Sequence, residues 1–112
     1  MDDHARFRAL AARLLRRGGF DVVGEAQDAA AGRRQQLALR PDVVLLDVML
    51  PDRSGVDLAR ELLAGPDAPR VILTSSRDRA DFGPGTSWPD GCAFIPKHEL
   101  TAGLLSAALD AR

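Results

Sequence analysis

The feature that most constrains the fold of this chain is a short apolar run that ends in a carboxylate. Val43-Val44-Leu45-Leu46 follows the helix-breaking pair Pro41-Asp42 and leads directly into Asp47. The run shows no alternation of polar and apolar residues, which is typical of a strand that is buried on both faces in a parallel sheet. The sequence therefore predicts a buried strand with a carboxylate at its carboxyl end.

The remainder of the chain alternates between the spacing of helices and the spacing of strands. Helical periodicity is seen at residues 5–17, from the N-cap Asp28 to Leu39, at 56–63 and at 100–111. Short apolar runs predict further strands at residues 21–26, 70–74 and 92–95. Strands that alternate with helices indicate an α/β fold with a parallel sheet.

The stretch from Asp81 to Asp90 does not fit this alternation. It contains two prolines and two glycines in ten residues, and both residue types disfavour a helix interior. We expect an irregular loop with at most a short turn of helix.

Length and composition narrow the class of protein. The 112 residues fit one small domain, residues 1–112, and the formal net charge of −1 argues against a general binder of nucleic acid or membrane surfaces. A single cysteine, Cys92, excludes a disulfide within the chain and fits a reducing compartment. The charged start lacks the apolar run of a signal peptide, and the apolar stretch around Asp47 is too short to span a bilayer. We expect a cytoplasmic protein without membrane contact.

Polar residues stand where the predicted strands end. Asp47 and Thr74 end two strands, Lys97 follows a third by two residues, and Asp2-Asp3 precedes the first helix. Sites in open parallel sheets form at the carboxyl ends of the strands. Clustered carboxylates favour a divalent cation with oxygen ligands such as Mg²⁺, a carboxylate can form an aspartyl phosphate, and a hydroxyl and an ammonium can bind phosphate oxygens. Lys97 is the single lysine among fifteen basic residues.

These motifs resemble those of bacterial two-component response-regulator receivers. The run from Val43 to Asp52 with Ser54-Gly55 is similar to their phosphorylation-site signature, and Asp2-Asp3-His4 is similar to their acidic pair. The strand that ends at Thr74 resembles the one that carries the signalling hydroxyl. Phe94-Ile95-Pro96-Lys97 resembles the strand with the switch aromatic and the lysine. The similarity covers nearly the whole chain in the right order.

The resemblance implies a fold and a role for each matching residue. The fold would be the doubly wound, flavodoxin-like receiver fold, in a two-component phosphorelay. Asp47 would accept the phosphoryl group, and Thr74 and Lys97 would bind it. Asp3 would be a direct Mg²⁺ ligand, Asp2 would act through water, and Asp47 and the backbone carbonyl of Met49 would complete the set. Phe94 would turn inward when Thr74 moves toward the phosphate. The implied partner is a sensor histidine kinase.

The chain departs from the receiver pattern at its start, because receivers have a hydrophobic strand before the acidic pair and here Met1 directly precedes Asp2. The missing strand would be the central one of the 2-1-3-4-5 order. We therefore expect a frayed terminus at Asp2-Asp3 and a chain that is poorly stable or oligomeric. Three explanations remain: a truncated or misassigned start, a strand supplied by a partner or in a homodimer, or a degenerate receiver without metal.

Two alternatives to a phosphorylated receiver differ in their chemistry. A pseudo-receiver would be a protein-interaction module that works without phosphorylation, and failure of Asp2 and Asp3 to bind metal would mark it. An aspartyl phosphatase would require a second Asp two residues after Asp47. The residue at that position is Met49, which argues against a phosphatase. We therefore expect a binding module rather than an enzyme, beyond phosphorylation and dephosphorylation of itself. The segment from Thr74 to Lys97 is similar to receivers that carry a DNA-binding tail, yet this chain shows no nucleic-acid-binding motif, so we expect no direct contact with nucleic acid.

Overall fold

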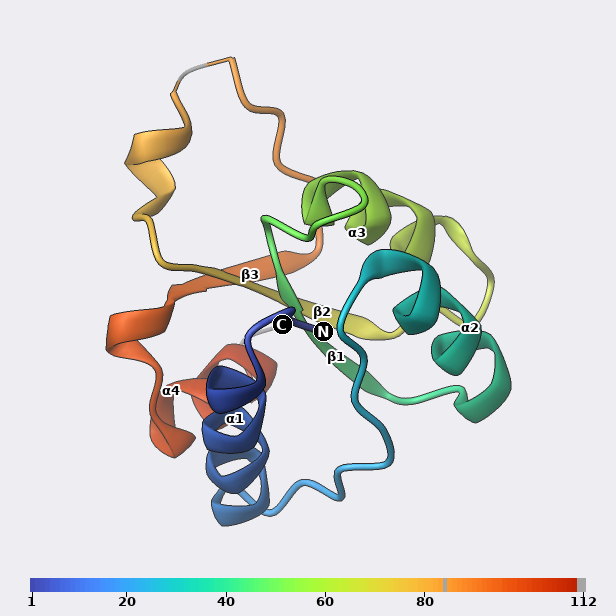
Figure 1. Cartoon of the computed structure of the whole chain (residues 1–112), viewed down its shortest axis with the longest axis vertical. Coiled ribbons are helices and arrows are strands. Elements are labelled where there is room, and N and C mark those ends of the chain that lie inside the picture. Colours follow the sequence, from blue (N-terminus) through green and yellow to red (C-terminus); the bar gives the residue numbers. More distant parts are fainter. Residues whose placement is uncertain (84, 111–112) are drawn as a thin grey trace.

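A computed structural model describes residues 1–83 and 85–110. Within these residues a three-stranded parallel sheet in the order β1-β2-β3 is flanked by helices (Figure 1). The elements run in chain order α1 (Ala5–Arg17), α2 (Ala29–Leu39), β1 (Val43–Asp47), α3 (Gly55–Ala64), β2 (Arg70–Ser75), a 3₁₀ turn (Arg79–Phe82), β3 (Cys92–Pro96), a second 3₁₀ turn (Lys97–Glu99) and α4 (Ala102–Asp110). The predicted α/β fold with a parallel sheet is confirmed.

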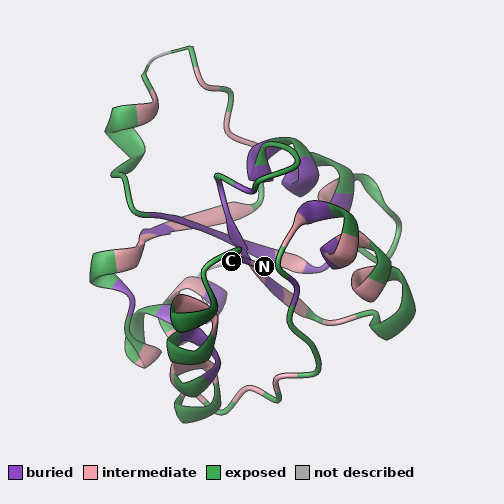
Figure 2. Ribbon diagram, viewed as in Figure 1, coloured by how far each residue is buried: buried purple, intermediate pink, exposed green. Residues whose placement is uncertain are grey.

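The sheet separates two hydrophobic cores because successive side chains of a strand point to opposite faces. Leu73 packs with Leu46 and Leu58 on the face covered by α2 and α3. Ile72, the next residue of the same strand, packs with Leu105 on the face covered by α1 and α4. β1 and β2 are accordingly mostly buried and β3 is half-buried, whereas the outer faces of the helices are exposed (Figure 2). The apolar runs that form β1 and β2 are thus explained by a hydrophobic core on each face of the sheet.

Local signals place the helices close to their predicted bounds. The Asp28 side chain accepts a 2.7 Å hydrogen bond from the backbone N–H of Ala31 and so caps α2, as expected. The Ser54 hydroxyl accepts from Val56 N–H at the start of α3. The stretch around residues 81–90 contains only the 3₁₀ turn and irregular backbone among its described residues, as predicted. Every helix in the described part of the chain is too short or too polar to cross a membrane.

The strand predicted at Asp21–Ala26 is wrong, because this segment has no regular secondary structure. Its Val23 is 52% exposed. A strand needs a neighbour for its backbone hydrogen bonds, and the sheet order begins with β1, so no strand lies between β1 and this segment. The sequence predicted that the first, central strand of the sheet would be missing, and this is confirmed in the described residues. The missing neighbour explains why residues 21–26 do not pair as a strand.

Candidate functional site

The carboxyl ends of the three strands bring Asp47, Thr74 and Lys97 to one edge of the sheet. Asp47 is the last residue of β1 and lies opposite Thr74 in the parallel register with β2. Lys97 directly follows β3, which pairs in parallel with β2. Asp47 and Thr74 are 3% and 1% exposed. Residues from three separate parts of the chain therefore form one buried polar cluster.

The side chain of Lys97 bridges two carboxylates. Its Nζ lies 2.6 Å from Oδ2 of Asp2 and 3.2 Å from Oδ2 of Asp47. The Lys97 side chain is itself only 15% exposed, and its ammonium lies 4.3 Å from the centroid of the Phe7 ring. Buried charges require such pairing because the interior solvates them poorly.

The start of the chain is held against the sheet, so the frayed terminus that the sequence led us to expect is wrong. Met1 donates from its amino group to the carbonyl of Leu45 (2.6 Å) and accepts from the N–H of Asp47 (2.9 Å). Asp2 then donates from its N–H to the carbonyl of Ala26 (3.0 Å) and is only 2% exposed. These backbone bonds place Asp2 at the site without a complete preceding strand.

Burial and the shared ammonium shift the pKa values of the three charged groups. Burial raises the pKa of Asp47, and the N–H of Met49 and the charge of Lys97 offset this only in part. Burial also acts to raise the pKa of Asp2. The contact of Asp2 with Lys97 and the hydrogen bond that it accepts from the N–H of His4 outweigh this effect, so the pKa of Asp2 is lowered overall. The pKa of Lys97 is raised because its contacts with both carboxylates outweigh the effect of burial. Asp2 is thus the more strongly ionised partner of Lys97.

Four side chains at this edge could share a cation. Asp2, Asp3, His4 and Asp47 each offer a ligand atom, and these atoms lie within 4.8 Å of one another. Asp3 and His4 are exposed, whereas Asp2 and Asp47 are buried. Three ionised carboxylates and one ammonium leave a charge of −2, a balance that favours a divalent cation with oxygen ligands.

Two buried oxygen atoms support this fit. Within the described residues, Oγ1 of Thr74 and Oδ2 of Asp2 have no hydrogen-bond partner. Oδ2 of Asp2 is in ion-pair contact with the ammonium of Lys97 at 2.6 Å. Because buried polar atoms are normally paired, both atoms have spare capacity, Asp2 to accept and Thr74 to donate as well as accept. The donor set therefore fits Mg²⁺ beside an anionic oxygen.

The loop after Asp47 is folded back beside the carboxylate. Met49 donates from its N–H to Oδ1 of Asp47 (3.1 Å) and forms an antiparallel bridge with Ser54. The side chain of Asp52 accepts from the N–H groups of Ala29 (2.8 Å) and Ala30 (3.0 Å), which ties this loop to the start of α2. The backbone of Met49 is thereby fixed next to Asp47.

Phe94 belongs to a group of three aromatic rings. It is half-buried in β3, and its ring centroid is 5.3 Å from that of Trp88 and 6.3 Å from that of Phe82. It lies opposite Leu73 in the register of β2 and β3, one residue before Thr74.

Sequence reasoning missed three residues that shape the site. Phe7 of α1 lies against the ammonium of Lys97. Arg8 donates from its guanidinium to the carbonyl of Asp2 (2.7 Å). His4 is the N-cap of α1, and its Nδ1 also lies 3.2 Å from carboxylate oxygens of both Asp2 and Asp3. Only the position of His4 beside the acidic pair could have signalled such a contact.

Comparisons with known proteins agree with this geometry. The family model for the response regulator receiver domain matches residues 1–104. The DNA-binding response regulator MtrA of Mycobacterium tuberculosis is 41% identical over 83 residues, which cover 72% of this chain and 35% of that protein. The transcriptional regulatory protein PdtaR of the same organism is 37% identical over 78 residues, 70% of this chain and 38% of that protein. The chain thus spans well under half the length of these relatives.

Solved structures share the fold over nearly the whole chain. A two-component response regulator of the LuxR family from Aurantimonas sp. SI85-9A1 superposes with a TM-score of 0.76 at 28% identity, covering 98% of this chain and 79% of that chain. A response regulator receiver domain protein from Clostridium thermocellum gives a TM-score of 0.75 at 26% identity, with coverages of 97% and 86%. The three-stranded sheet is therefore a shortened form of the flavodoxin-like receiver sheet.

Proposed function

The chain belongs to the response regulator receiver domain family, and we propose that Asp47 accepts a phosphoryl group from a sensor histidine kinase in a magnesium-dependent step. In this proposal residues 1–112 form one receiver domain of a two-component phosphorelay. The observation that carries it is the buried pair Asp2–Asp47 around the ammonium of Lys97. Asp47 provides a nucleophile, and the ammonium of Lys97 provides a cation within reach of it.

Each residue of the cluster has a defined task in this proposal. A carboxylate oxygen of Asp47 forms the new P–O bond as the P–N bond of the donor's phosphohistidine breaks. The ammonium of Lys97 then binds a phosphoryl oxygen, and Oγ1 of Thr74, which lacks a partner among the described residues, donates to another. Both residues already lie at the same edge of the sheet as Asp47, so only small movements of their side chains would accompany the transfer.

The acidic residues would hold Mg²⁺. We assign Asp3 as a direct ligand, Asp2 as a ligand through water, and Asp47 and the carbonyl of Met49 as the remaining protein ligands. The bound cation offsets the negative charge that builds on the transferred group. The proximity of Asp2, Asp3 and Asp47 supports this assignment, as does the hydrogen bond that holds the Met49 backbone beside Asp47.

Phosphorylation would be read out through β2 and β3. When Thr74 turns toward the phosphoryl group, the space that it leaves lets the ring of Phe94 move inward, which alters the surface formed with Phe82 and Trp88. The position of Phe94 supports this role, because it lies opposite Leu73, the residue before Thr74 in β2, and its ring contacts those of Phe82 and Trp88. The partner that reads this surface would be a protein; a direct contact of this domain with nucleic acid is not part of the proposal.

Intact mass spectrometry tests the central step. The chain is incubated with Mg²⁺ and acetyl phosphate, and Asp47→Asn serves as the matched control because it keeps the shape of the side chain. We expect the mass of one phosphoryl group in the parent, none in Asp47→Asn and none with a chelator. A parent that gains no mass although it binds Mg²⁺ in a calorimetric titration contradicts phosphorylation of Asp47 and favours a phosphorylation-independent interaction module.

A further inference from the structure

The ring of His4 lies against the carboxylates of the acidic site, although the proposed function gives it no task. Its Nδ1 is 3.2 Å from Oδ1 of Asp2 and 3.2 Å from Oδ1 of Asp3. His4 is the N-cap of α1, yet its side chain makes no capping hydrogen bond to the helix. The imidazole therefore does not perform the usual task of an N-cap side chain and is available to the site.

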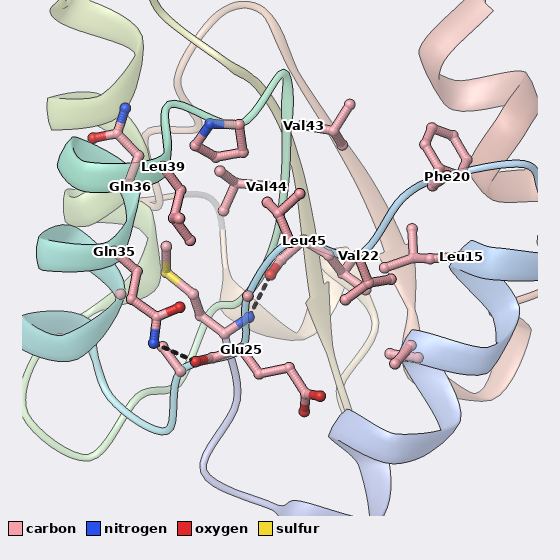
Figure 3. Close-up of a pocket in the computed structure, with 18 of the residues that line it drawn as sticks. Leu15, Phe20, Val22, Glu25, Gln35, Gln36, Leu39, Val43, Val44 and Leu45 are labelled. Atoms are coloured by element: carbon pink, nitrogen blue, oxygen red, sulfur yellow. Dashed lines mark hydrogen bonds between the residues drawn. The ribbon is translucent and has the colours of Figure 1, made fainter.

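Backbone hydrogen bonds hold this ring in place from both directions. His4 donates from its N–H to Oδ1 of Asp2 (2.8 Å), and its carbonyl accepts from the N–H of Arg8 (3.0 Å). At the start of the same segment, the amino group of Met1 donates to the carbonyl of Leu45, a bond that is drawn at β1 in Figure 3. The segment between these bonds is attached at both ends, so its side chains keep a defined arrangement.

The two distances from Nδ1 are those of ligand atoms that share one cation. A zinc ion bonds to imidazole nitrogen and to carboxylate oxygen at about 2.1 Å, so neighbouring ligand atoms lie roughly 3.0 Å apart in octahedral geometry and roughly 3.4 Å apart in tetrahedral geometry. Both Nδ1–oxygen distances fall between these values. A hydrogen bond explains them less well. One N–H can point at only one of the two oxygens, and a charge-assisted bond would be about 2.7–2.9 Å long.

Buried oxygen atoms of the same cluster provide a second, independent indication of a ligand. Oγ1 of Thr74, a residue that is 1% exposed and lies opposite Asp47, has no hydrogen-bond partner within the described residues. Oδ2 of Asp2, a residue that is 2% exposed, likewise has none besides its ion pair with Lys97. Because buried polar atoms are normally paired, the cluster has unused capacity to bind a ligand.

From this geometry we propose that Nδ1 of His4 is a further ligand of the acidic site, so that the site binds a transition-metal dication such as Zn²⁺ more tightly than Mg²⁺. Imidazole is a preferred ligand of Zn²⁺, whereas Mg²⁺ takes oxygen ligands and binds here through the oxygens alone. The side chains of His4 and Asp3 are 70% and 38% exposed, which leaves an entry path for the ion. The inference rests on the proposed function only in that it concerns the same site.

Calorimetric titrations with Zn²⁺ and with Mg²⁺ test the inference in the full chain, in one buffer and without a phosphoryl donor. The variant is His4→Asn, because asparagine keeps a favourable N-cap and offers an oxygen ligand in place of the ring nitrogen. The matched control is His98→Asn, which removes the other of the two histidines, one that lies 3.8 Å from Asp78. Asp3→Asn tests whether both cations bind at the acidic site. NMR of isotope-labelled histidine rings during the Zn²⁺ titration identifies the nitrogen that binds.

We expect the parent to bind Zn²⁺ at least about tenfold more tightly than Mg²⁺, and His4→Asn to lose about tenfold in Zn²⁺ affinity while its Mg²⁺ affinity stays within about twofold. His98→Asn should match the parent, Asp3→Asn should weaken both cations, and Zn²⁺ should shift the Nδ1 resonance of His4.

An equal loss of both cations in His4→Asn would overturn the inference, because His4 would then only position the carboxylates. Zn²⁺ binding that is unchanged in His4→Asn would overturn it as well, since the nitrogen would not be a ligand. A chain that binds Zn²⁺ through His4 but gains no phosphoryl mass contradicts phosphorylation of Asp47 and supports the inference, so the two failures are distinguishable.

Discussion

The buried amino group of Met1 should make the stability of this chain depend on pH in a window where few other groups titrate. Its pKa falls from 8.0 in the unfolded chain to about 6 in the folded chain because of burial. Between these values the unfolded chain binds more protons than the folded one, so stability falls as the pH is lowered from 8 to 6. Two pKa units correspond to about 2.7 kcal/mol, since each unit is about 1.36 kcal/mol.

Acetylation of the α-amine isolates this effect. An acetylated Met1 still donates its N–H to Leu45 but carries no charge at any pH. We expect the acetylated chain to be more stable than the parent by about 2–3 kcal/mol at about pH 5.5, and by close to nothing at about pH 9. For a domain of this size that difference at low pH is about 10 °C in melting temperature.

Urea unfolding of both forms across this range measures the difference. Contributions from all other ionisable groups are present in both forms and cancel in the comparison. The other amine, that of Lys97, has a raised pKa and does not titrate in this window. If the two forms have parallel stability profiles, the amino group of Met1 is exposed to solvent and its buried position against β1 is refuted.

Three further substitutions test the site. Lys97→Met should raise the affinity for Mg²⁺ by about tenfold in calorimetry at neutral pH, since one nearby positive charge is removed; an unchanged affinity would contradict the ion-pair geometry. Gly55→Ala should lower stability in urea by about 1–3 kcal/mol, because a Cβ at this position would overlap the carbonyl of Asp47, and a neutral result would refute that close approach. Asp52→Ala should lower the urea midpoint more than Asp52→Asn, which keeps one acceptor for the N–H of Ala29; equal effects would argue against a capping role.

Most of the fold could be predicted because its elements depend on local patterns. The helix at Ala5–Arg17 and the strand from Val43 are found where apolar spacing put them, since periodicity directly reflects burial. The segment Asp21–Ala26 was misassigned because its apolar residues suit a strand but pairing depends on a distant neighbour. A single sequence reports propensity, whereas strand formation is decided by the whole sheet.

The sequence could predict which residues of the candidate site lie together, but not which of them are buried or how they are held. Polar residues at strand ends were sufficient to bring Asp47, Thr74 and Lys97 together, because parallel strands end at one edge. Which carboxylate is buried depends on backbone bonds that no local pattern encodes: Asp2 is enclosed and Asp3 is exposed. The clamp between Asp52 and α2 joins residues 23 positions apart, so it too was not visible in the sequence.

The start of the chain and the acidic site are connected through two residues, which couples their energetics. Met1 is held against β1 by its backbone bonds, and the same bonds hold Asp2 next to Asp47. A cation bound by the acidic residues would restrict the motion of this segment, so Mg²⁺ should slow the amide exchange of Asp47, whose N–H bonds to Met1. By reciprocal linkage, a variant that weakens the attachment of Met1 should bind Mg²⁺ less tightly by the same factor. Exchange at Asp47 that Mg²⁺ does not change would mean that Asp2 is already fully positioned by its bond to Ala26 and its contact with Lys97.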